Sequence, residues 1–244
     1  MLRLNGCFAR RAQQQAVAPV RFGGQWSAAM RWSSTDSAAS SRLLVLFYSM
    51  YGHNYAMAKA AVEGASEGGA KATLKRVKET LPDEILTKMG ALEAGKQWAD
   101  VPIADPTELA DYDGIILVFP TRFGTFPAQM KAFLDATGGL WAGGKLTDKV
   151  GSAIVSTATQ HGGQETTIQG AHAYFLHHGM VVVGLPYAFG PMSAMDEAQG
   201  LSPYGATSLA GPKGDRAVSK NEQDGARYQA KRTAQIAAKM RGSK

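Results

Sequence analysis

Hydrophobic and polar residues alternate in two patterns along this 244-residue chain from Leu43 onward. Short apolar runs are typical of strands buried in a parallel sheet, and they alternate with longer stretches in which apolar residues recur at helical spacing. Strand-like runs occupy residues 43–48, 72–77, 115–119, 150–155 and 180–184, and the last helix-like stretch covers 226–240. Five such alternations predict an α/β fold, a doubly wound, five-stranded parallel sheet with helices on both faces.

Other segments lack a strong version of either pattern. Residues 82–96 have only a weak helical pattern, and residues 188–222 are rich in Gly, Pro and Ser, which predicts a long irregular loop. The longest apolar runs are strand-sized and far short of the roughly 20 residues that span a bilayer. We therefore expect no integral membrane association.

The first 41 residues differ in composition from the rest. They contain five arginines, one acid and no lysine, with many Ser, Ala and Gln residues. This composition is typical of a mitochondrial transit peptide, and a disordered extension is the alternative. We therefore expect residues 42–244 to form the folded domain and predict a mitochondrial location, with a cytoplasmic location as the alternative.

The charge and the cysteine content argue against a nucleic-acid partner and against a metal site. Without the first 41 residues, the net charge falls from +6 to +2, because 21 basic and 19 acidic residues are left. No basic cluster is interleaved with aromatic residues, so no nucleic-acid partner is expected. The only cysteine is Cys7, and no group of residues has the spacing of metal ligands, so we expect no metal site.

Three loops that follow predicted strands carry the candidate chemistry, because ligands of such sheets bind beyond the carboxyl ends of the strands. The first loop connects a buried strand to a helix, where backbone N–H groups attract an anion. It has no lysine and no GxGxxG pattern, which excludes a Walker loop and a dinucleotide fingerprint. A monophosphate such as that of FMN needs only hydroxyls and amides. The residues of this loop are Ser49, Met50, Tyr51, Gly52, His53 and Asn54.

The other two loops are suited to a planar polar ring. In the second, Thr121 and backbone amides are candidate partners for the edge of a flavin, and Phe123 for its face; the loop consists of Pro120, Thr121, Arg122, Phe123 and Gly124. The third opens another helix with hydroxyls and glycines, and its candidate binding residues are Ser156, Thr157, Ala158, Thr159, Gln160, His161 and Gly162.

Six blocks in order resemble the WrbA family of NAD(P)H:quinone oxidoreductases over residues 43–242. They are Ser-Met-Tyr-Gly-His at 49–53, Pro-Thr-Arg-Phe-Gly at 120–124, Gly-Gly-Leu-Trp at 138–141, Gly-Gly-Gln-Glu-Thr-Thr at 162–167, His-His-Gly-Met at 177–180 and Ser-Pro-Tyr-Gly-Ala at 202–206. The resemblance implies a flavodoxin-like homotetramer with FMN bound, NADH or NADPH as electron donor and a quinone as substrate.

The resemblance also implies roles for individual residues. The first loop would hold the phosphate of FMN, and the other two loops would hold its isoalloxazine ring. Tyr51 and Phe123 would contact the nicotinamide or the substrate, Trp141 would border the substrate, and His177 would line the pocket as a proton donor. This chain has Ser-Thr-Ala-Thr-Gln-His at 156–161 where some members have Ser-Thr-Gly-Thr, which makes this part of the match weaker.

The expected reaction is a two-electron reduction of a quinone by a ping-pong hydride transfer through FMN. One alternative is an electron carrier of the flavodoxin type, and another is a non-catalytic scaffold on the same fold, because a fold alone does not determine function. The preference between NADH and NADPH stays open. The sequence does not place an acidic residue that would bind the ribose of NADH, or an arginine that would bind the additional phosphate of NADPH.

Overall fold

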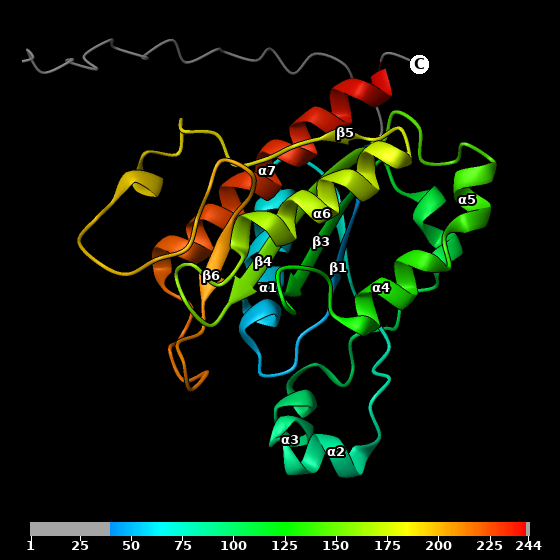
Figure 1. Cartoon of the computed structure of the whole chain (residues 1–244). Helices are drawn as coiled ribbons and strands as arrows, with labels where there is room; N and C mark the ends of the chain where they lie inside the picture. The colour runs from blue at the N-terminus through cyan, green and yellow to red at the C-terminus, as the bar shows by residue number, and fades with distance from the viewer. Residues whose placement is uncertain (1–39, 243–244) are drawn as a thin grey trace, which may run out of the picture. The chain divides into compact units, whose positions relative to one another are not determined.

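The computed structural model describes residues 40–242 of the chain, which form a parallel sheet with helices on both faces (Figure 1). The strands lie in the order β2-β1-β3-β4-β5, and β6 also pairs with β4. All of these pairings are parallel. The strands are β1 (Arg42–Phe47), β2 (Lys71–Arg76), β3 (Gly114–Pro120), β4 (Val150–Thr157), β5 (Val181–Val182) and β6 (Thr207–Leu209).

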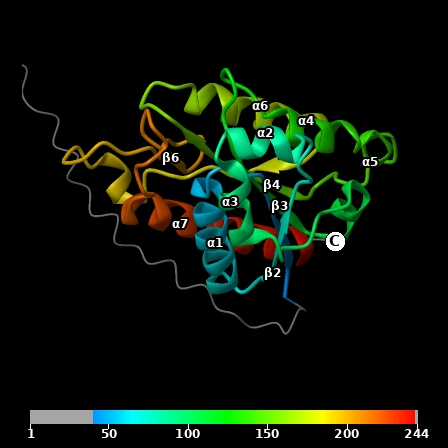
Figure 2. The same cartoon turned by 90° about the horizontal axis from the view of Figure 1, so that it is seen from below.

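Helices cover the sheet in two layers. Residues of alternate parity along the central strands point to opposite faces, so Leu43 and Val45 pack on one side and Leu44 and Leu46 on the other. Figure 2 shows the two layers from below. One layer contains α1 (His53–Glu67) and α7 (Lys220–Gly242), and the other contains α4 (Ala128–Asp135) and α6 (Gln164–His177).

The short helices lie in the connections between these elements. Two of them, α2 (Asp83–Lys88) and α3 (Ala91–Gly95), extend beyond the carboxyl ends of the strands (Figure 1). The remaining short helices are η1 (Lys96–Trp98), η2 (Pro106–Asp111), α5 (Gly138–Ala142) and η3 (Gly190–Ser193).

Glycine permits the close packing of α1 against α7. A Cβ atom at Gly64 would lie 2.0 Å from the carbonyl oxygen of Arg227, a separation that real Cβ atoms do not show. Ala61, Ala230 and Ala234 are likewise fully buried between the two helices. Small side chains therefore let these two helices pack closely on one face of the sheet.

The structure confirms the predicted fold class and corrects several boundaries. The weak helical stretch 82–96 is two helices, because Gly90 adopts a left-handed backbone (φ 68°) between them. The fifth strand is only two residues long. It pairs with the first residues of β4, which leaves the end of β4 available to a sixth strand that the sequence pattern did not predict.

The prediction of an irregular loop over residues 188–222 is wrong in part, since η3, β6 and the first turn of α7 lie within it. Helix α7 begins six residues earlier than its apolar periodicity predicted. The side chain of Ser219 accepts a hydrogen bond from the backbone N–H of Glu222, and Glu222 accepts one from the N–H of Ser219, which forms a capping box. The Ser-x-x-Glu spacing at 219–222 is the sequence signal for this start.

Candidate functional site

The three predicted loops meet at the carboxyl ends of β1, β3 and β4, as parallel topology requires. Together they line a cavity of about 440 Å³, within the roughly 300–1,000 Å³ usual for ligand pockets. Eleven residues proposed from the sequence line it: Ser49, Met50, Tyr51, His53, Asn54, Pro120, Thr121, Arg122, Ser156, Thr157 and Ala158. We call this cavity the carboxyl-edge cavity.

The first loop presents backbone donors to this cavity. The hydroxyl of Ser49 accepts a hydrogen bond from the backbone N–H of Gly52 at 3.0 Å, which closes the loop. Gly52 has φ 102°, a conformation that favours glycine, and no side chain caps the helix that begins at His53. The first amides of α1 therefore have no partner within their helix and are suited to an anion.

Asn54 offers an unpaired acceptor beside these donors. It is 2% exposed, and its Nδ2 donates a hydrogen bond to the hydroxyl of Ser156 at 2.8 Å. Its Oδ1 is buried and has no hydrogen-bond partner among the described residues. An unsatisfied buried acceptor is costly, so this atom is suited to a hydroxyl donor from a bound ligand, such as the ribityl chain of FMN.

The second loop is a tight turn with an exposed aromatic tip. Arg122 and Thr125 exchange backbone hydrogen bonds at 2.9 and 3.0 Å, and Thr121 accepts one from the N–H of Gly124. Phe123 at the tip has φ 53° and a fully exposed ring. A bulky residue in the left-handed region is strained and is characteristic of functional loops.

Arg122 connects the second loop to the first. Its Nη1 donates to the carbonyl of Thr121 at 2.8 Å, and its Nη2 lies 3.7 Å from the sulfur of Met50. The guanidinium group therefore lies between the two loops and lines the cavity. It gives this part of the cavity a positive charge.

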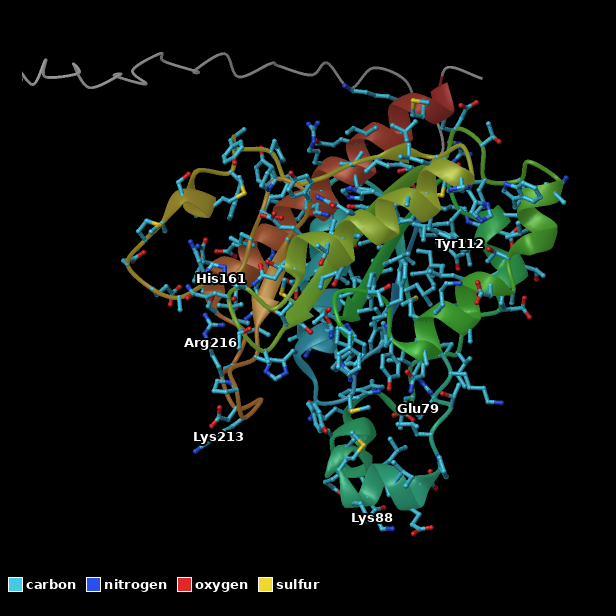
Figure 3. All side chains as sticks on the ribbon, in the orientation of Figure 1. Glu79, Lys88, Tyr112, His161, Lys213 and Arg216 are labelled. Atoms are coloured by element: carbon cyan, nitrogen blue, oxygen red, sulfur yellow. The ribbon has the colours of Figure 1, made fainter. Side chains whose placement is uncertain are left out.

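Only the first part of the third loop lines the carboxyl-edge cavity. Ser156, Thr157 and Ala158 line the carboxyl-edge cavity, but Thr159, Gln160 and His161 are exposed and do not line it, and neither does Gly162. Gln160 lines a separate hollow with Met192 and residues 194–200. Figure 3 shows His161 on the side of the β6 segment. The difference from the family pattern at 156–161 falls on this divided loop.

A fourth segment that the sequence analysis missed completes the wall of the cavity: Ala210, Gly211, Pro212, Lys213 and Gly214. The segment is far in sequence from the three loops and lies within the region predicted to be irregular, so the sequence pattern did not connect it with the site. Its Gly-Pro-Lys-Gly composition signals a turn but does not indicate what the turn contacts. Only the pairing of β6 with β4 brings it to the site.

Two predicted residues, His177 and Trp141, do not reach this cavity within one chain. His177 ends α6, a helix of about 20 Å that runs from the carboxyl to the amino end of the sheet. Trp141 lies in α5, which contacts η2, the short helix that precedes β3. In Figure 1, α5 lies well away from α2 and α3, which extend beyond the carboxyl ends of the strands. Both His177 and Trp141 are exposed, Trp141 by 60%.

Hydrogen bonds link the start of α5, the helix that contains Trp141, to the end of α6, the helix that ends at His177. The hydroxyl of Thr137, the residue before α5, lies 3.2 Å from Nε2 of His178 and 3.0 Å from the hydroxyl of Tyr174. Burial, and then the charge of His177, lower the pKa of His178. We call the group of Thr137, Trp141, Tyr174, His177 and His178 the amino-edge cluster.

A half-buried carboxylate organises the strand ends beside the cavity. Glu79 accepts hydrogen bonds from the hydroxyl of Tyr48, the amide of Gln129 and the backbone of Thr80 and Leu81. Burial by itself raises the pKa of Glu79, but these hydrogen bonds outweigh it and hold the pKa below its usual range. Glu79 also borders a smaller, mostly apolar hollow of about 260 Å³ that shares Ser49 and Met50 with the main cavity.

Within residues 40–242, no group of three or more potential ligands is placed to hold a metal ion. In the same residues, no helix has both the length and the apolar character needed to cross a membrane.

Comparison with known proteins shows the family of this chain. Residues 42–193 match the family described as NADPH-dependent FMN reductase. A protein of Geobacter metallireducens named NAD(P)H dehydrogenase (quinone) is 55% identical over 202 residues, which are 82% of this chain and 100% of the relative. The protein of that name from Paracoccus denitrificans is 53% identical and covers 81% of this chain and 94% of its own length.

A solved structure supports the same relationship. The flavodoxin, WrbA-like protein from Agrobacterium tumefaciens is 25% identical, covers 82% of this chain and 99% of its own, and superposes with a TM-score of 0.57. It confirms the flavodoxin-like fold that the resemblance implied.

The mitochondrial location predicted from residues 1–41 is wrong. The relatives are bacterial proteins, and a cytoplasmic location, the alternative, fits them. The composition of the segment was the only basis for the prediction, and the segment itself lies outside the described residues. The match of sequence and fold is to one family throughout, and the chain belongs to the flavodoxin-like NAD(P)H dehydrogenases (quinone), the family that its six sequence blocks indicated.

Proposed function

We propose that this protein binds FMN in the carboxyl-edge cavity and catalyses the oxidation of NADH or NADPH by a quinone. The observation that carries the proposal is the meeting of three β-to-α loops in one cavity. None of the sixteen described residues that line the cavity is acidic, which suits an anionic cofactor. Family membership supports the same cofactor and reaction.

The residues of the first loop fit the phosphate group of FMN. The uncapped amides at the start of α1 donate hydrogen bonds, and Gly52 lets the backbone approach the ligand closely. The buried Oδ1 of Asn54 accepts a hydroxyl of the ribityl chain. The second and third loops then hold the ring through Thr121, Arg122, Ser156 and Thr157, which line the same cavity.

When bound, FMN supplies an electrophilic ring that accepts hydride from the nicotinamide and passes two electrons to the quinone. The protein orients both partners at the mouth of the cavity. Tyr51 is 46% exposed there and contacts the nucleotide, while the exposed ring of Phe123 contacts the incoming ring. One open mouth serves both substrates in turn, which predicts ping-pong kinetics.

We further propose that His177 and Trp141 act on the site of a neighbouring copy in a homotetramer. Within one chain they lie at the other end of the sheet, and both are exposed. Trp141 then borders the quinone, and the imidazole of His177 donates a proton to its oxygen. The WrbA-like arrangement expected from the sequence supports this assembly.

The domain boundary is also a proposal. We assign the FMN-binding domain to residues 42–244, because the family match begins at residue 42 and the Geobacter metallireducens relative is covered in full by 202 residues of the chain. On this division, removal of residues 1–41 leaves FMN affinity unchanged.

The test is steady-state oxidation of NADH and of NADPH by benzoquinone, with and without added FMN. FMN-dependent turnover with parallel double-reciprocal lines is the expected result for the ping-pong reaction. Binding of FMN without turnover would replace the proposal with an electron carrier or a scaffold. Failure to bind any flavin would contradict the assignment of all three loops.

A further inference from the structure

The charged residues of the carboxyl-edge cavity are unevenly placed. The described residues that line it include two permanent cations, Arg122 and Lys213. Arg122 lies across the second loop and contacts the carbonyl of Thr121 and the sulfur of Met50. Lys213 lies on the missed segment 210–214, and Figure 3 shows it at the tip of the loop beyond Arg216. The two cations therefore come from different walls of the cavity.

The loop that carries Lys213 has a rigid base. Arg216 donates to both carboxylate oxygens of Glu222, at 2.9 and 3.0 Å, and to the carbonyl of Leu209. Glu222 is fully buried and also accepts the backbone N–H groups of Gly200, Leu209 and Ser219. An ion pair to a buried carboxylate, both of whose oxygens accept hydrogen bonds, is a well-defined anchor, so the base of the loop is held in one position.

A second contact ties this base to the first loop. Nε2 of His53 lies 2.8 Å from the carbonyl oxygen of Arg216. A carbonyl oxygen can only accept a hydrogen bond, so Nε2 of His53 is protonated and donates the hydrogen bond. Because His53 is the first residue of α1, this bond places the Lys213 loop beside the helix start whose amides have no side-chain cap.

The tip of the loop, unlike its base, is free to adjust. Gly211 and Gly214 both adopt positive φ, and residues 212–215 are exposed. The loop closes on itself through bonds from Arg216 N–H to the carbonyl of Ala210 and from Gly214 N–H to that of Gly211. A lysine on such a tip has a long, flexible side chain and reaches a nearby anion with little change in the backbone.

We propose that Lys213 is the counter-ion of the cofactor's phosphate and makes the site select FMN over riboflavin. The inference rests on the proposed binding of FMN. The first loop contains no lysine or arginine, so its amides and hydroxyls by themselves leave a phosphate dianion without a compensating full charge. The Lys213 ammonium supplies that charge from segment 210–214, and the Glu222–Arg216–His53 chain holds the base of this loop in place beside the start of α1.

The test measures dissociation constants of FMN and riboflavin, by quenching of flavin fluorescence, for the flavin-free full-length protein and its Lys213→Ala and Lys213→Arg variants. Lys213→Ala is expected to weaken FMN about 10-fold, to leave riboflavin unchanged and to flatten the salt dependence of FMN binding. Lys213→Arg retains most of the affinity. The matched control is Lys71→Ala, an exposed lysine at the amino end of β2, which changes neither constant.

Each other outcome has a distinct meaning. Equal weakening of FMN and riboflavin would overturn the proposal, because it would assign Lys213 a structural role, and no change in either would overturn it directly. Unchanged FMN binding with a raised KM for NADPH, but not for NADH, would reassign the lysine to the 2′-phosphate of the nucleotide. If the unaltered protein binds neither flavin, the proposed function fails, and not only the role of Lys213.

Discussion

The two ends of the sheet are built in different ways. At the carboxyl edge, four segments from distant parts of the sequence enclose a cavity with backbone amides, hydroxyls and two cations. At the amino edge, Trp141 and His177 lie on an exposed surface above buried Thr137 and His178. The first region is concave and complete enough to enclose a ligand within one chain. The second presents an aromatic ring and an imidazole outward, as the proposed action on another copy requires.

On the proposed function, this difference divides one chain into the parts of two half-sites. In that proposal the carboxyl edge holds the cofactor, and the amino edge provides groups that contact the substrate of a neighbouring copy. Changes at the first edge should therefore alter FMN affinity, and changes at the second should alter assembly and turnover.

The largest expected effect comes from removing the anchor of the carboxyl edge. Glu222→Ala leaves Arg216 without its partner and deletes the cap of α7, so we expect a loss of about 3 kcal/mol in the free energy of unfolding. Urea titration measures it. The control is Glu63→Ala, which breaks an exposed pair with Arg227 and should cost about 0.5 kcal/mol. Equal stability of the two variants would contradict the role of Glu222 as an anchor.

Trp141→Ala tests whether the amino edge is an interface. A tryptophan at the centre of an interface contributes about 2 kcal/mol, so we expect the subunit dissociation constant to rise about 30-fold and turnover to fall, without a change in FMN affinity. Sedimentation velocity and flavin titration give the two quantities. Tyr187→Ala removes another exposed aromatic ring and is the control. If Trp141→Ala weakens FMN binding in the separated subunit, the division between the two edges is wrong.

Asn54→Leu sharpens the assignment of the cofactor half. It removes the buried Oδ1 that has no protein partner, so FMN should bind about 10-fold more weakly. The flavin-free protein should lose less than about 1 kcal/mol, because loss of the bond to Ser156 is offset by relief of the unsatisfied acceptor. Ser66→Ala, on the exposed end of the same helix, is the control. Unchanged FMN affinity would remove Asn54 from the site.

The smallest effect is a pH dependence at the amino edge. Because burial lowers the pKa of His178 in the folded state, the unfolded chain binds more protons below about pH 6.5. This contribution to stability is fully present above pH 6.5 and is lost as the pH falls through the folded pKa. We expect His178→Gln to lose less stability than the unaltered chain between pH 7.5 and 5.5 in urea titrations. His161→Gln, at an exposed site, is the control; equal slopes would show that His178 does not titrate on unfolding.

The sequence by itself determined the fold class, the family and most of the lining of the carboxyl-edge cavity. The reason is local: buried strands such as 115–119 are continuous apolar runs, and loops that follow parallel strands always meet at one edge. Eleven predicted residues in one cavity follow from that rule. The capping box at 219–222 was equally readable, although its pattern was overlooked.

Only the tertiary structure decided which distant segments join these loops. Lys213 reaches the cavity because β6 pairs with the free end of β4, and a three-residue strand has too little pattern to predict. Likewise, the length of α6 carries His177 to the opposite edge from the loop that precedes it. Local patterns determine elements and their nearest loops, whereas contacts between segments far apart depend on packing that no short window of sequence contains.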